Sequence, residues 1–75
     1  MEMMSFFEIK LNPNITDFCI KRNAGNDWNV FFKIDGELHQ VKTQRGQIRN
    51  FKTVDNAVRF VESCGKTSKV TVLFD

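Results

Sequence analysis

The sequence is poor in the residues that build catalytic and metal sites. Its 75 residues include one histidine, His39, and two cysteines, Cys19 and Cys64. The cysteines stand far apart and lack the paired spacing of zinc or redox motifs. The histidine has no serine or cysteine at a motif spacing that would make it a general base. We therefore expect a non-enzymatic protein with no cofactor, no metal and no small-molecule substrate, and we interpret His39 as a surface or hairpin residue.

Long apolar runs and a strong net charge are also missing. No run approaches the roughly 18 residues that a membrane-spanning helix requires, so no membrane partner is expected. The formal net charge of +2 is too small for the whole molecule to attract phosphate, so a nucleic-acid contact would need local clustering of cations. No signal-peptide pattern precedes the cysteines, which predicts a cytoplasmic protein with two reduced thiols.

The composition is that of one globular unit. Apolar residues make up 41% and charged residues 27% of the chain, close to globular averages. Eight phenylalanines and Trp28 supply much of the apolar area that so small a chain must bury. We expect a single domain over residues 1–75, with residues 1–4 as a flexible N-terminus.

Alternation of apolar and polar residues predicts that much of the chain is β-strand. The pair Asp35-Gly36 predicts a two-residue hairpin turn, because both residues tolerate a positive φ. A short extended piece is expected over residues 47–52, after a turn at Arg45-Gly46. The predicted strands cover residues 5–11, 17–22, 28–35, 37–43 and 70–74.

Residues 53–64 change to a helical period. One apolar stripe is formed by Val54, Ala57, Val58, Val61 and Cys64. Thr53 suits the N-cap and Gly65 the left-handed position after the helix. The sequence therefore predicts an α+β fold, in which an antiparallel sheet of four to five strands has one helix on one face. The predicted order is β-β-β-β-(β)-α-β.

A single helix covers only one face of such a sheet, so the other face is expected to stay open. It would mix aromatic, basic and other side chains: Phe6, Lys10, Cys19, Lys21, Phe31, Lys33 and Leu73. Phe6 and Phe31 are the candidate interface residues. They would stack unpaired bases, or else pack against the N-terminal segment or a symmetric partner chain. The face thus supports the alternative function of a protein–protein adaptor or homodimer, including a phage-type inhibitor of a host system.

The most informative cluster lies between His39 and Val54. It contains four cations and no acid: Lys42, Arg45, Arg49 and Lys52. The remaining seven basic and nine acidic residues give the rest of the chain a charge of −2. Amide side chains lie among these cations, a composition suited to hydrogen bonds with phosphates and base edges. We predict that the four cations contact DNA, RNA or a nucleic-acid-bound protein; the alternative is an ordinary solvated hairpin.

A turn, an aromatic residue, a helix cap and a helical stripe follow one another after a hairpin that begins at Trp28. The stretch runs from Arg45-Gly46 through Arg49-Asn50-Phe51-Lys52-Thr53-Val54-Asp55-Asn56-Ala57-Val58-Arg59-Phe60-Val61 to Gly65. Over residues 28–65 this pattern resembles a family of short plasmid and genomic-island proteins described as partition-associated and ParC-like. The resemblance implies an accessory protein of mobile DNA, with no established enzymatic activity and no agreed binding residues.

Overall fold

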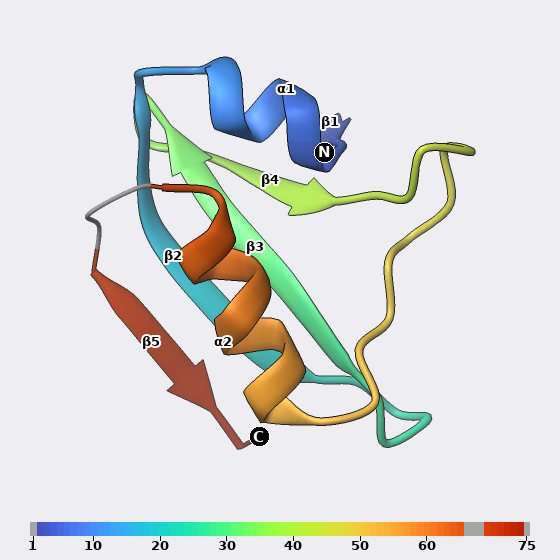
Figure 1. Cartoon of the computed structure of the whole chain (residues 1–75). Coiled ribbons are helices and arrows are strands. Elements are labelled where there is room, and N and C mark those ends of the chain that lie inside the picture. The colour runs from blue at the N-terminus through green and yellow to red at the C-terminus, as the bar shows by residue number, and fades with distance from the viewer. Residues whose placement is uncertain (1, 66–68, 75) are drawn as a thin grey trace.

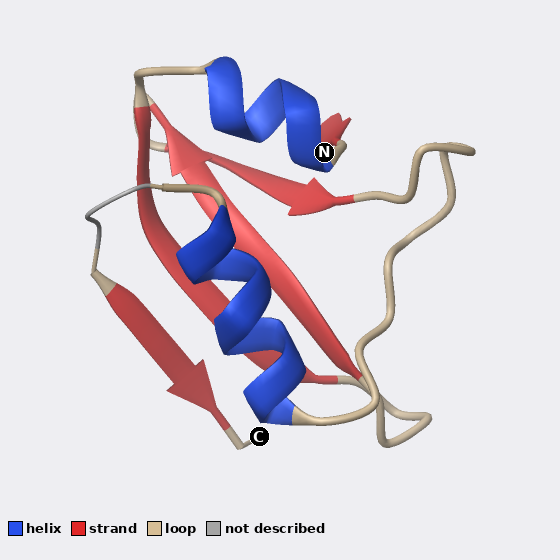
Figure 2. Ribbon diagram, viewed as in Figure 1, coloured by secondary structure: helices blue, strands red, loops and turns tan. Residues whose placement is uncertain are grey.

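The computed structural model describes residues 2–65 and 69–74 and contains one five-stranded sheet (Figure 1). The strands lie in the order β1-β4-β3-β2-β5, and α2 packs across one face (Figure 2). The elements are β1 (Glu2–Met4), α1 (Phe6–Leu11), β2 (Ile15–Arg22), β3 (Trp28–Ile34), β4 (Glu37–Val41), α2 (Val54–Ser63) and β5 (Val70–Leu73). The predicted α+β class is confirmed.

The sheet is mixed, so the prediction of a purely antiparallel sheet is wrong. β3 runs antiparallel to β2 and β4, whereas β1 pairs in parallel with β4 and β5 in parallel with β2. Parallel neighbours need a crossover connection. Between the parallel neighbours β2 and β5, the chain passes through β3, β4 and α2. The two outer strands are therefore held by pairings that the local sequence pattern does not encode.

The N-terminal region differs most from its prediction. Residues 5–11 were expected to be a strand, but Ser5 caps the helix α1. Its backbone N–H and its hydroxyl both donate to Glu8 Oε1, each at 3.0 Å. The spacing Ser-x-x-Glu is a capping box, which outweighs the alternation of three apolar residues. Of these three, Ile9 is buried while Phe7 and Leu11 are 61% and 81% exposed.

Glu2–Met4, within the segment expected to be flexible, form the strand β1. Glu2–Met4 pair with β4, and the Lys42 N–H donates to the Met4 carbonyl at 3.0 Å. Met1 lies outside the described residues. The short strand β1 covers one side of β4, which limits how much sheet edge is left exposed.

The central hairpin follows its prediction closely. Asp35 and Gly36 take φ values of 51° and 82°, as a two-residue turn between β3 and β4 requires. Alternation along β3 also holds, since Val30 and Phe32 are fully buried under the helices while Lys33 is exposed on the other face. This hairpin fixes which side chains face the helices.

Helix α2 closes the core as its stripe predicts. Ala57, Val61 and Cys64 are buried, together with Phe60 at the edge of the stripe. The Thr53 hydroxyl oxygen accepts from the Asn56 N–H at 3.1 Å, which confirms the cap. Each phenylalanine or valine buried in this way contributes about 1.5–3 kcal/mol. Within the described part of the chain, neither helix is long and apolar enough to cross a membrane.

The expected extended piece at 47–52 is present as two isolated bridges instead of a strand. Lys42 pairs with Ile48, and Trp28 pairs with Phe51 through two hydrogen bonds of 2.8 Å. After β4 ends at Val41, this segment therefore runs beside the first residue of β3. We call residues 42–52 the basic segment. It runs from the end of β4, around the turn, to the start of α2 (Figure 1).

Candidate functional site

The structure separates the four cations of the basic segment. Lys42 lies at the end of β4, 3.9 Å from Glu8 of α1. Arg45 is exposed in the turn beyond β4. Only Arg49 and Lys52 line a common hollow. The predicted set of four is thus divided among three places, and Arg49 and Lys52 are the pair that lies in a concave surface.

A shallow groove of about 540 Å³ lies between the basic segment and α2. We call it the arginine groove. Its lining residues are Arg49, Asn50, Phe51, Lys52, Asn56, Arg59, Phe60 and Ser63. Three of these are cations, three are small polar residues, and none is a carboxylate. The groove therefore combines positive charge with hydrogen-bonding groups, which is the chemistry that phosphate and base edges require.

Arg49 is held in place by aromatic rings. Its guanidinium carbon lies 5.1 Å from the centre of the Phe51 ring and 4.9 Å from that of Phe60. Both rings are 6% exposed, and their centres are 5.3 Å apart. A guanidinium at this distance is attracted by the ring faces and keeps its N–H donors at its rim. The side chain is therefore positioned before any ligand arrives.

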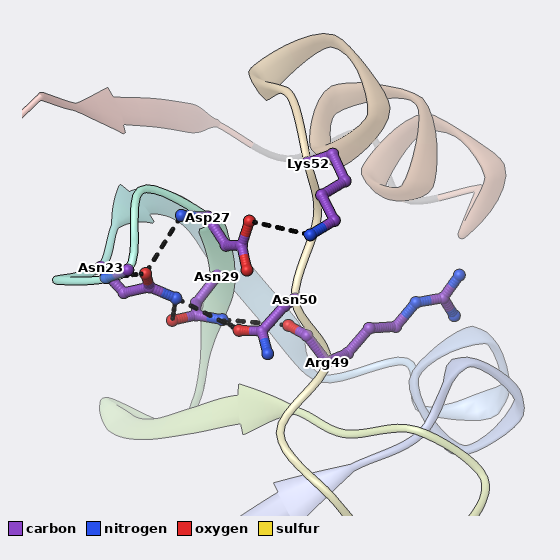
Figure 3. A network of polar contacts seen from close by, with 7 residues as sticks. Asn23, Asp27, Asn29, Arg49, Asn50 and Lys52 are labelled. Carbon is purple, nitrogen blue, oxygen red and sulfur yellow. Dashed lines mark hydrogen bonds and ion pairs between the residues drawn. The ribbon is translucent and has the colours of Figure 1, made fainter.

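An asparagine network fixes the backbone that carries Arg49. Asn29 Nδ2 donates to the Arg49 carbonyl at 3.0 Å and to Asn50 Oδ1 at 2.8 Å. Asn23 Nδ2 donates to Asn29 Oδ1 and to the same Asn50 oxygen, at 3.1 and 3.2 Å. Figure 3 shows the Arg49 side chain extending away from this network. Asn29 of β3 thus sets the position of a residue twenty positions further along the chain, and Asn23 of the preceding loop supports it.

Lys52 is paired, but only weakly. Its Nζ lies 3.7 Å from Asp27 Oδ1, and its side chain is 85% exposed (Figure 3). An exposed pair of this kind contributes about 0–1 kcal/mol and is screened by salt. The ammonium group is therefore able to exchange Asp27 for an anionic ligand at little cost.

Lys42 belongs to a different cluster, around the first turn of α1. The pKa of Glu8 is lowered mainly by the hydrogen bond from the Ser5 backbone N–H, then by that from the Ser5 hydroxyl, and last by the charge of Lys42. All three favour the ionised carboxylate. Glu8 and Lys42 thus help to secure α1 against the end of β4, a structural role for a residue that the sequence assigns to binding.

Arg59 is the cation of the groove that the sequence analysis missed. It lies on α2, outside the acid-free segment that defined the candidate cluster. Asn56, Arg59 and Ser63 follow one another at i, i+3 and i+7, so they share one flank of the helix. A search for polar residues beside the apolar stripe would have found this flank.

The two candidate interface residues lie on opposite sides of the sheet. Phe31 is on the open face, opposite Cys19 of β2, as predicted. Phe6 is not: because residues 6–11 form a helix, its ring packs 5.7 Å from that of Phe60. Lys10 also lies on this helix and not on the open face, and its Nζ is 5.7 Å from the Phe6 ring centre. Both residues therefore belong to the helical side of the molecule.

His39 lies in β4 of the central hairpin, which is one of its two predicted alternatives. It is only 5% exposed, so it is not a surface residue. Its ring stacks on Phe32, with centres 5.6 Å apart and planes 10° from parallel. The two residues face each other across β3 and β4, which explains the stacking. His39 is thus part of the packing of the sheet.

No protein-family model matches this chain, and none of the curated proteins compared with it is significantly similar. The resemblance of residues 28–65 to partition-associated proteins therefore stays a hypothesis. The functional interpretation rests on the geometry of the described residues.

Proposed function

We propose that this protein is a non-enzymatic binding module that holds single-stranded nucleic acid in the arginine groove. The observation that supports the proposal most is the gathering of Arg49, Lys52 and Arg59 around one hollow, with no carboxylate among the described residues that line it. Phosphate contacts supply most of the sequence-independent affinity of nucleic-acid-binding proteins. Three cations at one concave surface are a favourable arrangement for such contacts.

Arg49 is the central residue of the proposed site. Its guanidinium is already stacked on two buried rings, so it loses little side-chain freedom when a phosphate binds. Among the residues that the structure describes, it has no ion pair with a carboxylate to break. A guanidinium plane also offers a surface on which an unpaired base stacks. Arg49 therefore serves both phosphate and base.

The shape of the groove favours a single strand over a duplex. A concave surface lined by one helix and one extended segment admits a flexible backbone, whereas a duplex is convex and would touch only the rims. Asn50 and Asn56 add amide groups for base edges along the same path. Asn50 accepts its two network bonds through Oδ1, so its Nδ2 group remains a donor for a ligand.

Arg45 and Lys42 take secondary places in this proposal. Arg45 is exposed at the turn that leads into the groove, where it would contact a phosphate further along the strand. Lys42 is engaged by Glu8 and would add only a diffuse attraction. We expect the protein to act in the cytoplasm, where Cys19 and Cys64 stay reduced, and as an accessory protein of mobile DNA if the resemblance of residues 28–65 holds.

The test is fluorescence anisotropy with a labelled oligonucleotide of about 12 nucleotides, a length within the range of single-strand binding sites. Titrations at about 50 and 200 mM salt give the number of phosphates contacted. About three contacts predict that log K falls with log salt with a slope near −2 for a single strand. Arg49→Gln and Arg59→Gln should each reduce that slope by about 0.7.

The matched control is Arg22→Gln, which makes the same chemical change at an exposed arginine outside the groove. It should leave the slope and the affinity almost unchanged. Equal losses for Arg22→Gln and Arg49→Gln would show that binding is only a response to total charge. Absence of binding at the lower salt would end the proposal, and tighter binding of a duplex of the same length would contradict the choice of a single strand.

A further inference from the structure

The open face of the sheet bears an apolar centre that no element of the described chain covers. Alternate residues of β2, β3, β4 and β5 point away from the helices there. One hollow of about 420 Å³ is lined by Cys19, Lys21, Phe31, Leu38 and Leu73. Leu38 and Leu73 are 42% and 43% exposed, and Phe31 is half-buried. The open face is the side of the sheet that carries this hollow and two adjoining ones, of which one is lined by Lys33 and Lys69 among others and the other by Arg22 and Asn23 among others.

The strand register explains why these side chains meet. Phe31 lies directly opposite Cys19, and Lys33 directly opposite Leu38. Leu38 is therefore the diagonal neighbour of Phe31 on the same face, within reach of a large side chain. The adjoining hollows share Cys19 and Leu38 on one side and Phe31 on the other. The apolar centre is thus continuous from β4 to β5.

The rim of the open face is positively charged. Its hollows are lined by four cations, namely Lys21, Arg22, Lys33 and Lys69. Among the described residues that line them, Asp17 is the one carboxylate. The ion pairs described above join Lys42 to Glu8 and Lys52 to Asp27, and neither pair lines this face. An apolar centre inside a predominantly positive rim is complementary to an apolar ligand that carries negative charge.

We propose that the open face docks an acidic amphipathic segment of a partner protein, in which leucine or phenylalanine side chains alternate with carboxylates. The apolar side chains would fill the hollow around Phe31 and Leu38, and the carboxylates would meet Lys21, Lys33 and Lys69. Interfaces are commonly built in this way, with an apolar centre and a polar rim. This inference concerns a second surface and does not rest on the proposed function of the arginine groove.

Two other occupants fit the open face less well. A second copy of the chain, docked face to face, would bring rims of the same positive sign together, which is unfavourable. A single-stranded nucleic acid would meet cations on this face but few aromatic rings on which its bases could stack. Among the described residues that line the hollows, the aromatic ones are Phe31 and Phe18, and Phe18 is buried. Leucines and a cysteine favour aliphatic side chains over the faces of bases.

The probe is a fluorescein-labelled synthetic peptide in which Leu and Phe alternate with Glu and Asp, followed by fluorescence anisotropy. For a patch of this size we expect a Kd on the order of 100 μM. A peptide with lysine in place of the acids, and one with serine in place of Leu and Phe, should each bind at least about tenfold more weakly. A Kd weaker than about 1 mM for the acidic peptide would overturn the proposal.

Point variants locate the peptide on the protein. Phe31→Ala should weaken binding about tenfold, and Lys21→Gln or Lys33→Gln about two- to threefold each. Leu38→Ser is a second apolar variant, at an exposed position where folding is least affected. The emission of Trp28, which is buried on the other face against Phe74, reports that each variant is folded.

Three results would count against this assignment. Unchanged peptide affinity in both Phe31→Ala and Leu38→Ser would show that the peptide binds elsewhere. A dimeric mass in sedimentation experiments that Leu38→Ser abolishes would identify a second copy as the occupant. Competition between the peptide and an oligonucleotide for the open face, lost in Lys33→Gln, would identify nucleic acid. If Arg49→Gln abolishes oligonucleotide binding and Phe31→Ala does not, the oligonucleotide binds in the arginine groove and the open face remains available to the peptide, as both proposals require.

Discussion

The arginine groove and the open face are both basic, yet they are built in different ways. The groove gathers residues from the 49–52 segment and from α2, and its position depends on the asparagine network and on two phenylalanine rings. The open face needs only the register of neighbouring strands, because alternate residues of each strand already point the same way. A change in long-range support should therefore disturb the groove and spare the open face.

The chemistry of the two surfaces differs as well. In the groove the aromatic rings are buried beneath Arg49, so the exposed groups are guanidinium, ammonium and amide. On the open face the apolar side chains themselves are exposed and the cations stand around them. The same overall charge thus favours a polyanion at one surface and an acidic, apolar ligand at the other.

The largest expected effect follows from removing the ring that supports the groove. Phe60→Ala deletes a ring that contacts Phe6, Phe51 and Arg49, and such a change costs about 3–5 kcal/mol. A domain of this size has a total stability of the same order, so we expect the variant to be largely unfolded in far-UV circular dichroism. Phe31→Ala is the matched variant on the open face and should lose only about 1 kcal/mol. Equal losses would mean that the two surfaces share their support.

A smaller effect should follow from cutting the asparagine network. Asn29→Ala removes the side-chain donor of the Arg49 carbonyl and one of the two donors to Asn50 Oδ1, at a cost of about 1–3 kcal/mol in the free energy of unfolding. Urea denaturation monitored by Trp28 emission measures this loss. Oligonucleotide affinity should fall while peptide affinity is retained. Asn14→Ala, at an exposed turn, is the control and should change neither property; unaltered oligonucleotide binding in Asn29→Ala would contradict the positioning role of Asn29.

A substitution in the β3–β4 turn should have the opposite effect and weaken binding at the open face while sparing the arginine groove. Gly36→Ala meets no atom within 4 Å, so its cost arises from the positive φ alone and should be about 1–2 kcal/mol. Because this turn sets the register that places Leu38 beside Lys33, the peptide should bind more weakly and the oligonucleotide as before. Gly25→Ala is the control, since a side chain there makes only an ordinary contact with Asn23. Loss of oligonucleotide binding in Gly36→Ala would argue that the groove depends on the hairpin turn.

The smallest effect concerns the pairing of Glu8 with Ser5 and Lys42. The lowered pKa of Glu8 means that its contribution to stability is present above the ordinary carboxylate pKa and is lost as the pH falls through the lowered value. Glu8→Gln should therefore be slightly less stable at neutral pH and show a smaller drop in urea midpoint on acidification. Glu37→Gln, at an exposed position of β4, serves as the control. If Glu8→Gln also strengthened oligonucleotide binding markedly, Lys42 would belong to the nucleic-acid site after all.

Local patterns predicted the central elements well. The alternation of β3, the Asp35-Gly36 turn and the stripe of α2 are each determined by residues that are neighbours in sequence. They failed at Ser5–Leu11, where two patterns compete. The Ser5 and Glu8 cap favours a helix, and the alternation of Phe7, Ile9 and Leu11 favours a strand. The helix buries Ile9 and packs Phe6 against the core, and it leaves Phe7 and Leu11 exposed.

The candidate site was predicted only in part, for a physical reason. A run of cations in sequence says nothing about their directions once the segment leaves the sheet. Glu8 and Asp27 attract Lys42 and Lys52 from distant parts of the chain, and Arg59 joins Arg49 only because α2 packs beside the extended segment. Such meetings depend on tertiary contacts that charge counting does not contain. The mixed sheet was missed for the same reason, since parallel partners are distant in sequence.

The most direct test of two separate surfaces is a ¹H–¹⁵N correlation titration of one sample with the single-stranded oligonucleotide and then with the acidic peptide. We predict that the oligonucleotide shifts the amides of residues 49–63 and that the peptide afterwards shifts those around Cys19, Phe31 and Leu38, without displacing the oligonucleotide. A common set of shifted amides, or release of one ligand by the other, would contradict the account.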